Sequence, residues 1–360
     1  MGRKLLTLVF VAALAACDDP LVIIGDLPGF MRLTAGVPDS AGIRVDSFAV
    51  RTKLTGPAGV AADSTGVVYF GDLRSRIFRV TSQGKLTRVM NHDPCFVKTC
   101  VGRPQGLAVA PGGNALYIAD DMSDKIWRLN LINGGVELIA GTGVNAVTQD
   151  GAVATAAPLS SPTAIVVLPD GRIAFAERNA NKIRVIGSDG ILRTLAGDGT
   201  LAAPPESGTL TSPLPLPTGL ALEGNTLYVS ETFTHTIRAI DLAAGTIRRV
   251  AGNGLAGFSG DNGPALEAAF DYPAALSAAA NQLYVSDQNN DRVRVVNLQT
   301  SIVSTFAGTG SRVYNGNGRA AGETSLFRPA GLAANRFGFL YIADQGHHIV
   351  WRTPIRANLQ

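Results

Sequence analysis

The stretch Leu283-Tyr284-Val285-Ser286-Asp287, with Arg292-Val293-Arg294-Val295 behind it, is the most regular copy of a unit that recurs along the chain. Each copy places small and apolar residues around an aromatic side chain and ends in an acid. The other five copies are Val68–Asp72, Leu116–Asp120, Ile173–Glu177, Leu227–Glu231 and Leu340–Asp344. Consecutive closing acids lie 48 to 57 residues apart. The chain therefore contains six repeats of one unit.

Each repeat has the pattern of four short strands separated by turn residues. It opens with proline and a small apolar run, as in Pro273-Ala274-Ala275-Leu276, and its fourth strand often ends in Ala-Gly, as at Ala251-Gly252. The 41 glycines and the low charged fraction of 16% suit turn-rich β structure. Six such units predict an all-β, six-bladed β-propeller. An open stack of repeats is disfavoured because no capping segment would cover its apolar ends.

The sixth repeat stops at Ile349-Val350-Trp351-Arg352 and a short tail, so its fourth strand is missing. A possible strand, Arg44–Val50, precedes the first repeat. We expect this N-terminal strand to complete the sixth blade, because pairing the two ends of the chain would close the ring and remove exposed sheet edges. The propeller is accordingly assigned to residues 43–360.

The N-terminus resembles the signal of a bacterial lipoprotein. Arg3-Lys4 precedes the apolar run Leu5–Ala13, which is too short to span a bilayer as a helix. Leu14-Ala15-Ala16-Cys17 resembles the lipobox, in which the cysteine is acylated and becomes the new N-terminus. This implies a signal peptide at 1–16, a lipidated Cys17 with a flexible tether at 17–42, and a membrane anchor on the periplasmic or extracellular side of the cell envelope. The alternative is an ordinary secretory signal that ends near a cysteine.

From about residue 56 to residue 352 the repeats resemble NHL repeats, and the links between them carry the resemblance. Gly252–Pro273, which contains Asp261-Asn262-Gly263, resembles the glycine-rich connector of bacterial NHL proteins. Connectors of nearly the same length are Gly141–Pro162, Gly197–Pro217 and Gly308–Pro329. The second of these departs from the pattern at Pro204-Pro205 and Pro213-Leu214-Pro215. The resemblance implies a six-bladed propeller but no single function, because NHL propellers include interaction modules, sensors, RNA-binding domains and an amidating lyase.

Six acids close the second strands, and a basic residue follows in each third strand. The acids are Asp72, Asp120, Glu177, Glu231, Asp287 and Asp344, and the basic residues are Arg79, Arg128, Arg184, Arg238, Arg294 and Arg352. The carboxylates could form a ring for a metal or substrate, or each could cap a loop and pair with its arginine across strands. Recurrence in all six repeats favours the structural role, because a catalytic site needs different groups in different places.

The loops after the second strands and the connectors should lie on one face, which is the candidate binding face. Its polar residues are Asn179, Asn181, His235, Asp261, Asn289, Asn290, Asp291, His347 and His348. The alternative is a set of solvated polar loops. Zinc would need three or four converging ligands, and only His235 and His347 could approach each other near the channel. No cofactor is expected for a binding module; an enzyme of the gluconolactonase-like or amidating-lyase-like type would hold calcium or zinc.

Cys95 and Cys100 lie close together in a chain that carries an export signal, which predicts a local disulfide. The net charge of +3 and the absence of a basic run give no electrostatic case for nucleic acid. We therefore expect a monomeric, lipid-anchored binding or scaffold module rather than an enzyme, with another envelope protein or a small ligand as partner. The alternative is a calcium- or zinc-dependent hydrolase or lyase.

Overall fold

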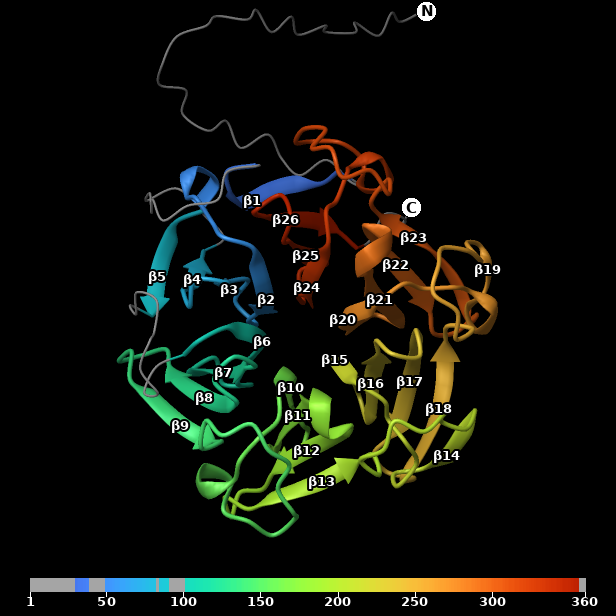
Figure 1. The fold of residues 1–360 in the computed structure, drawn as a ribbon. Coiled ribbons are helices and arrows are strands. Elements are labelled where there is room, and N and C mark those ends of the chain that lie inside the picture. Colours follow the sequence, from blue (N-terminus) through green and yellow to red (C-terminus); the bar gives the residue numbers. More distant parts are fainter. Residues whose placement is uncertain (1–29, 39–48, 82–83, 91–100, 356–360) are drawn as a thin grey trace, which may run out of the picture.

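Six antiparallel sheets stand around a central axis like the blades of a fan (Figure 1). The computed structural model describes residues 30–38, 49–81, 84–90 and 101–355. The first strands of consecutive sheets are neighbours around the axis, and the first strand of the last sheet returns to that of the first. The prediction of an all-β, six-bladed propeller is confirmed.

The blades are numbered in chain order, and their strands run from the axis outward. Blade 1 contains β2 (Pro57–Ala62), β3 (Val68–Asp72), β4 (Ile77–Val80) and β5 (Leu86–Met90). Blade 2 contains β6 (Pro104–Val109), β7 (Ala115–Asp120), β8 (Lys125–Asn130) and β9 (Val136–Ala140). Blade 3 contains β10 (Pro162–Val167), β11 (Ile173–Glu177), β12 (Lys182–Ile186) and β13 (Leu192–Ala196).

The remaining blades include strands that do not follow simple chain order. Blade 4 contains β15 (Pro217–Glu223), β16 (Thr226–Glu231), β17 (Thr236–Asp241), β18 (Thr246–Ala251) and, outermost, β14 (Ser207–Thr209). Blade 5 contains β20 (Pro273–Ala279), β21 (Gln282–Asp287), β22 (Arg292–Asn297), β23 (Ile302–Ala307) and, outermost, β19 (Gly263–Pro264). Blade 6 contains β24 (Pro329–Ala334), β25 (Phe339–Asp344), β26 (Ile349–Pro354) and β1 (Arg32–Gly36).

Short 3-10 turns complete the described structure. They are η1 (Ala49–Arg51), η2 (Ala154–Ala156), η3 (Arg178–Ala180), η4 (Ala265–Glu267), η5 (Gln288–Asn290) and η6 (Ala321–Glu323). Within the described ranges, no helix has the length and apolar character needed to cross a membrane.

The hydrophobic core consists of layers between neighbouring blades. One layer joins Tyr228 and Ile237 of blade 4 to Leu276, Val285 and Val303 of blade 5, and the other pairs of neighbours pack in the same way. Because strand side chains alternate between the two faces of a sheet, both faces of each blade supply apolar residues to a layer. Burial on both faces explains the near-continuous apolar runs of the second strands.

The ring closes as expected, but through a different strand. β1 pairs with β26, with Arg32 opposite Arg352 and Gly36 opposite Ile349. The expectation that Arg44–Val50 would form this strand is wrong: residues 49–51 form η1, and 39–48 lie outside the described part. The tether assigned to 17–42 therefore contains a propeller strand.

The sequence signal for β1 is its ending, Ala35-Gly36, which matches the Ala-Gly ends of the fourth strands of blades 2 to 5. Gly36 has a φ of +97°, and a Cβ there would collide with the carbonyl oxygen of His348. Gly252 meets the carbonyl of His235 in the same way. Only glycine fits where the fourth strand passes this turn so closely.

The four connectors that enter blades 3 to 6 cross the outer edge of the blade that each enters. β14 pairs with β18, β19 pairs with β23, and isolated bridges join Val153 to Ile191 and Phe30 to Ala320. Figure 1 shows β14 and β19 at the rim of the ring. The connectors therefore cover edge strands that would otherwise expose unpaired backbone groups.

Candidate functional site

The turns after the second strands and the connectors share one end of the ring, which we call the connector face. In an antiparallel sheet the second and fourth strands end on the same side, so each acid and each Ala-Gly end lie there. The opposite face carries the other two turns of each blade, such as the turn between β8 and β9.

The six strand-end acids are fully buried. In five blades the carboxylate accepts a hydrogen bond from the backbone N–H two residues before the proline that opens the first strand. These bonds are Thr55 N to Asp72 (3.1 Å), Gly102 N to Asp120 (2.5 Å), Ser160 N to Glu177 (2.8 Å), Asp271 N to Asp287 (2.7 Å) and Phe327 N to Asp344 (2.9 Å). The acids therefore tie the second strand to the start of the first.

The expected pairing of each acid with an arginine of the third strand occurs in two blades. Nη1 of Arg184 lies 3.0 Å from Glu177, and Nη1 of Arg294 lies 3.5 Å from Asp287. In blades 2 and 6 the same register position holds Trp127 and Trp351, whose indole N–H groups donate to the acids at 3.3 and 2.9 Å. In blade 1 that position holds Phe78.

The pairing is wrong for Arg79, Arg128 and Arg352. Each lies one residue beyond the equivalent position, and a shift of one residue moves a side chain to the other face of the strand. Arg128 accordingly pairs with Glu137, while Asp72 pairs with Arg76 of the preceding turn.

Burial raises the pKa of several acids, because the charged form loses its hydration. The pKa of Glu231 rises to about 7 and that of Asp287 to about 6, with Arg238 and Arg294 acting against the rise. Burial also raises the pKa of Glu177 against the opposing effect of Arg184.

Four predicted binding residues instead join the blades. Asn181, His235, Asp291 and His348 all have left-handed backbone conformations, with φ between 54° and 62°. Each accepts a hydrogen bond from the residue before the proline of the next blade, as does Asp124. The bonds are Ser161 N to Asp124 (2.8 Å), Leu216 N to Asn181 (3.0 Å), Tyr272 N to His235 (3.2 Å), Arg328 N to Asp291 (2.8 Å) and Gly56 N to His348 (3.0 Å).

Three more of the predicted residues make contacts within the fold. Asp261 pairs with Arg294 at 2.8 Å, and the side chain of Asn290 donates to Gly257 O and Asp287 at 2.8 Å each. His347 is buried, with Nδ1 2.8 Å from Asp344 and Nε2 2.9 Å from Arg312 O. His235 and His347 therefore do not converge on a shared site. No group of three or more His, Cys, Asp or Glu that could hold a metal occurs among the described residues.

The last two predicted residues, Asn179 and Asn289, are exposed on the connector face, where Asn289 donates to Asp271 at 3.1 Å. The proposed lipidation site Cys17 and the proposed disulfide of Cys95 with Cys100 lie outside the described residues.

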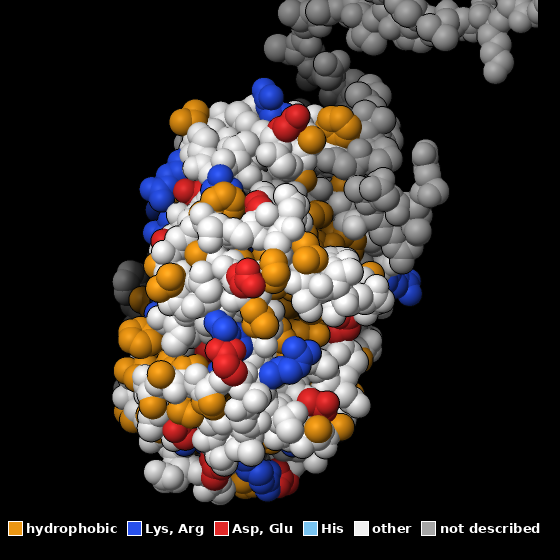
Figure 2. All heavy atoms as spheres, turned by 90° about the vertical axis from the view of Figure 1, so that its right-hand side faces the viewer, with side chains coloured by type: hydrophobic (Ala, Val, Ile, Leu, Met, Phe, Trp, Pro, Cys, Tyr) orange, Lys and Arg blue, Asp and Glu red, His pale blue; other side chains and the backbone are white. Residues whose placement is uncertain are grey.

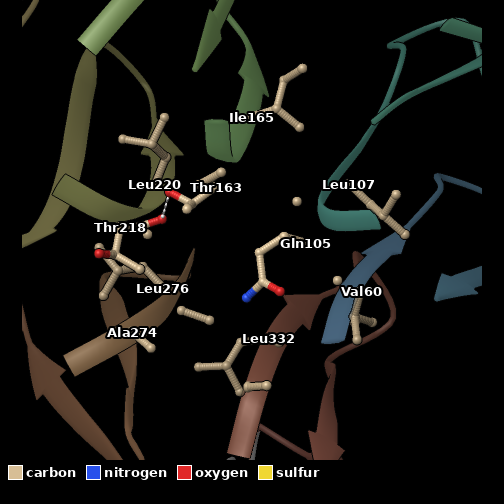
Figure 3. A pocket seen from close by; sticks show the side chains of 17 residues that line it. Val60, Gln105, Leu107, Thr163, Ile165, Thr218, Leu220, Ala274, Leu276 and Leu332 are labelled. Carbon is tan, nitrogen blue, oxygen red and sulfur yellow. Dashed lines mark hydrogen bonds between the residues drawn. The ribbon is translucent and has the colours of Figure 1, made fainter. Parts of the chain in front are cut away.

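A narrow channel runs along the axis between the first strands (Figure 3). Its wall contains one branched apolar residue from each blade, and the list is Val60, Leu107, Ile165, Leu220, Leu276 and Leu332. Gln105, Thr163 and Thr218 add polar groups, and Figure 3 shows the Gln105 amide reaching toward the middle. The cavity holds about 60 Å³, and no acidic, basic, histidine or cysteine side chain is among the described residues that line it.

The residue after each acid lies near the start of a first strand, and in five blades it is polar. We call five of them the mouth residues: Asp121, Arg178, Thr232, Gln288 and Gln345. Asp121 pairs with Arg103, whose Nε lies 2.6 Å away, and Arg178 reaches from blade 3 to the Tyr272 hydroxyl at 3.1 Å, at the entry to blade 5. Thr232 lies 3.1 Å from Thr218.

The mouth residues belong to the turns of the candidate binding face, but none of them is among the predicted binding residues. Most of the predicted residues lie later in the same turns, whereas each mouth residue directly follows a strand-end acid.

Large apolar side chains are exposed on the same face. Met122 is 71% exposed in the turn after β7, and Leu255 is 67% and Val313 74% exposed in two connectors. The connector face thus combines unlike polar groups around the channel with apolar side chains farther out.

Comparison of the sequence with known proteins agrees with this architecture. The family model of the teneurin NHL domain matches residues 39–226. Protein SUPPRESSOR OF QUENCHING 1, chloroplastic, of Arabidopsis thaliana is 29% identical over 270 residues, which are 72% of this chain and 25% of that protein. NHL repeat-containing protein 2 of Bos taurus is 26% identical over 288 residues, 71% of this chain and 39% of that protein. The chain spans well under half the length of both relatives.

Solved structures with the same fold have diverse described roles. An auxiliary nutrient binding protein from Bacteroides thetaiotaomicron superposes with a TM-score of 0.67 at 14% identity, covering 90% of this chain and 75% of that one. A gluconolactonase from Xanthomonas campestris superposes with a TM-score of 0.57 at 16% identity, covering 90% and 89%. At these identities the likeness extends to the fold.

Proposed function

This chain belongs to the teneurin NHL domain family of NHL-repeat β-propellers, and we propose that it is a binding or scaffold module that holds a protein partner on its connector face. We further propose that it acts in the bacterial cell envelope, anchored through acylated Cys17.

The observation that carries the proposal is the composition of the connector face. Protein interfaces combine exposed apolar or aromatic anchors with polar groups, and Met122, Leu255 and Val313 lie on the same face as the mouth residues. The channel, at about 60 Å³, is smaller than the roughly 300 Å³ at which small-molecule pockets begin. A protein segment lying across the face suits these dimensions.

Charge supports a protein rather than a nucleic acid. The chain carries a net charge of only +3, and nucleic-acid sites need a basic patch or stripe. Figure 2 shows basic and acidic side chains interspersed over the side of the ring that contains blades 4 and 5.

The residues of the channel do not favour a hydrolase or lyase of the calcium-dependent propeller type. Calcium takes six to eight oxygen ligands, usually including carboxylates, and no carboxylate is among the described residues that line the channel. At the mouth, Asp121 is already paired with Arg103. We therefore propose no enzymatic activity.

The test is proximity cross-linking in cells that produce the chain, followed by mass spectrometry. Met122→Asp and Leu255→Asp place charges on the connector face, and Ile132→Asp is the matched control because Ile132 is 82% exposed in the β8–β9 turn of the opposite face. A partner that is captured by the wild-type chain and by I132D but lost with M122D and L255D supports the proposal. A partner that survives both connector-face changes contradicts it.

The anchor is tested separately by metabolic labelling with an alkyne fatty acid. The wild-type chain should incorporate the label and remain with membranes, whereas Cys17→Ser should do neither, because one thiol carries the acyl group. Label retained by the C17S variant would contradict the assignment.

A further inference from the structure

Blade 4 breaks the hydrogen-bond pattern of the strand-end acids. The residue two before the opening proline of this blade is Pro215, which has no N–H to donate. Glu231 is fully buried, and only its Oε2 is bonded, to the hydroxyls of Thr234 (3.0 Å) and Thr236 (2.7 Å). Its Oε1 is buried without a partner.

Arg238 of this blade also lacks the connector carboxylate that pairs with the equivalent arginine in blades 3 and 5. In blades 3 and 5 the guanidinium pairs with an aspartate nine residues after the Ala-Gly end: Arg184 with Asp150 at 3.2 Å and Arg294 with Asp261 at 2.8 Å. The corresponding connector residue of blade 4 is Glu206, which pairs instead with Arg249 at 2.8 Å.

Arg238 is 1% exposed; it donates through Nη2 to the carbonyl of Pro205, and its Nε is buried without a partner. Arg294 also has an unpartnered Nε, but Phe258 and Phe270 lie over its guanidinium at 4.9 and 5.1 Å. Over Arg238 there is a pocket instead.

This pocket, with a volume of about 290 Å³, lies between the connector and the outer strands β17 and β18, which Figure 1 shows beside β14. Arg238 and Arg249 supply guanidinium groups, and Thr236 a hydroxyl. Pro204, Pro205 and Phe233 supply apolar surface, with Phe233 56% exposed at the rim.

We propose that this blade 4 pocket binds a small carboxylate with an apolar body, its carboxylate on Arg249 in front of the buried Arg238 and its body against Phe233 and the Pro204-Pro205 segment. The planar guanidinium matches a carboxylate with two parallel hydrogen bonds. The pocket lies at blade 4 on the connector face, next to Leu255, but it is tested with a small ligand on the purified chain, so either proposal can fail alone.

The local charge favours a monoanion over a phosphate. Glu206 neutralises Arg249, which leaves the charge of Arg238 for a ligand, and the acids Glu206 and Glu231 lie on either side. A phosphate dianion would be repelled by Glu206 and Glu231 and attracted by Arg238 alone, so it should bind less well than a monoanion. The apolar wall likewise suits a carboxylate that carries a ring.

Titration of Glu231 couples binding to pH. Burial raises its pKa to about 7, and the group facing it is Arg238 on β17, which in turn lies near Arg249 on β18 and Glu206 on the connector. When Glu231 is protonated, Arg238 is free to attract the ligand. Affinity should therefore increase as the pH falls from 8 to 6.

The test is a titration of the purified chain with benzoate at pH 6 and pH 8, followed by calorimetry and ligand-observed NMR. Arg249→Gln should weaken binding by about tenfold or more, since a charge-assisted hydrogen bond is lost, and Phe233→Ala should weaken it several-fold. Arg248→Gln is the matched control, because Arg248 is exposed on the opposite face of β18. Circular dichroism establishes that each variant is folded.

Saturable benzoate binding that is stronger at pH 6, reduced in R249Q and F233A and unchanged in R248Q supports the proposal. No saturation up to tens of millimolar, or an equal loss in R248Q and R249Q, overturns it. Inorganic phosphate binding more tightly than benzoate would overturn the assignment to carboxylates.

Discussion

Blades 3 and 4 contain the same pair of buried residues, but the hydrogen bonds of the pair are made in blade 3 and incomplete in blade 4. Each has a buried glutamate at the end of its second strand and a buried arginine seven residues later. In blade 3, Glu177 accepts from Ser160 N and Arg184, and Arg184 also reaches Asp150 and the carbonyl of Thr148. In blade 4, Glu231 and Arg238 each retain a buried polar atom without a partner.

The difference lies in the connector and not in the strands. Pro215 removes one N–H, and Glu206 turns to Arg249 and away from Arg238. A buried charged group is costly unless its hydrogen bonds are made, so the same strand motif stabilises blade 3 and leaves blade 4 open to a ligand. Repeats that look alike in their strands can therefore differ in function through their links.

The largest expected effect is the difference in unfolding free energy between variants that lack Arg184 and variants that lack Arg238. Arg184→Met leaves Glu177 buried without its cation, and breaking such a buried pair should cost about 3 to 5 kcal/mol of unfolding free energy. Arg238→Met removes one hydrogen bond, to the carbonyl of Pro205, together with an Nε that has no partner, so its cost should be about 1 kcal/mol. Urea denaturation of both variants measures the difference, and equal costs would contradict the contrast between the blades.

The second prediction concerns pH. The folded pKa of Glu231, about 7, exceeds its ordinary value of 4.5, so the folded state holds the proton more tightly than the unfolded chain. The stability that Glu231 contributes is then fully present below pH 4.5 and is lost as the pH rises to about 7. Asp287, with a pKa of about 6, adds to the lower part of the fall.

Glu231→Gln should flatten the upper part of this profile, since glutamine does not titrate. Melting temperatures measured from pH 4 to pH 8 for both proteins provide the comparison. A difference between the wild-type and E231Q melting temperatures that does not change between pH 4 and pH 8 would contradict a raised pKa at Glu231.

The smallest expected effect distinguishes two asparagines of one turn. Asn181→Ala loses the bond to Leu216 N and puts alanine at a φ of 55°, which together should cost about 1 to 2 kcal/mol. Asn179→Ala changes an exposed side chain and should stay within about 0.5 kcal/mol. Thermal unfolding of the two variants measures the difference. A larger loss of stability for N179A than for N181A would contradict the role of Asn181 in joining blades 3 and 4.

The repeat pattern was sufficient to predict the propeller because period, strand alternation and turn residues all act locally. Closure was predictable in kind, yet the closing strand was placed wrongly, since Ala35-Gly36 is a short signal outside the clear repeats. The reason for glycine at position 36 is its close contact with the carbonyl of His348, which is far away in the sequence.

The candidate site was less accessible to sequence reasoning. Asn181 and His348 have the residue types of ligand-binding loops, but their left-handed backbone and contacts with the next blade are visible only in three dimensions. The blade 4 pocket had a signal, the proline-rich departure of its connector. Its consequence, a missing N–H opposite Glu231, required the register of the other blades.

The contrast between blades 3 and 4 is tested most directly by titration of Glu231, followed by NMR with side-chain carboxyl ¹³C labelling of glutamate. The chain has seven glutamates, and the spectrum of E231Q identifies the signal. We predict a midpoint at about 7, because burial opposes ionisation and one oxygen has no partner. A midpoint near the ordinary value of 4.5 would show that the carboxyl is satisfied in blade 4 and would remove the basis of the contrast.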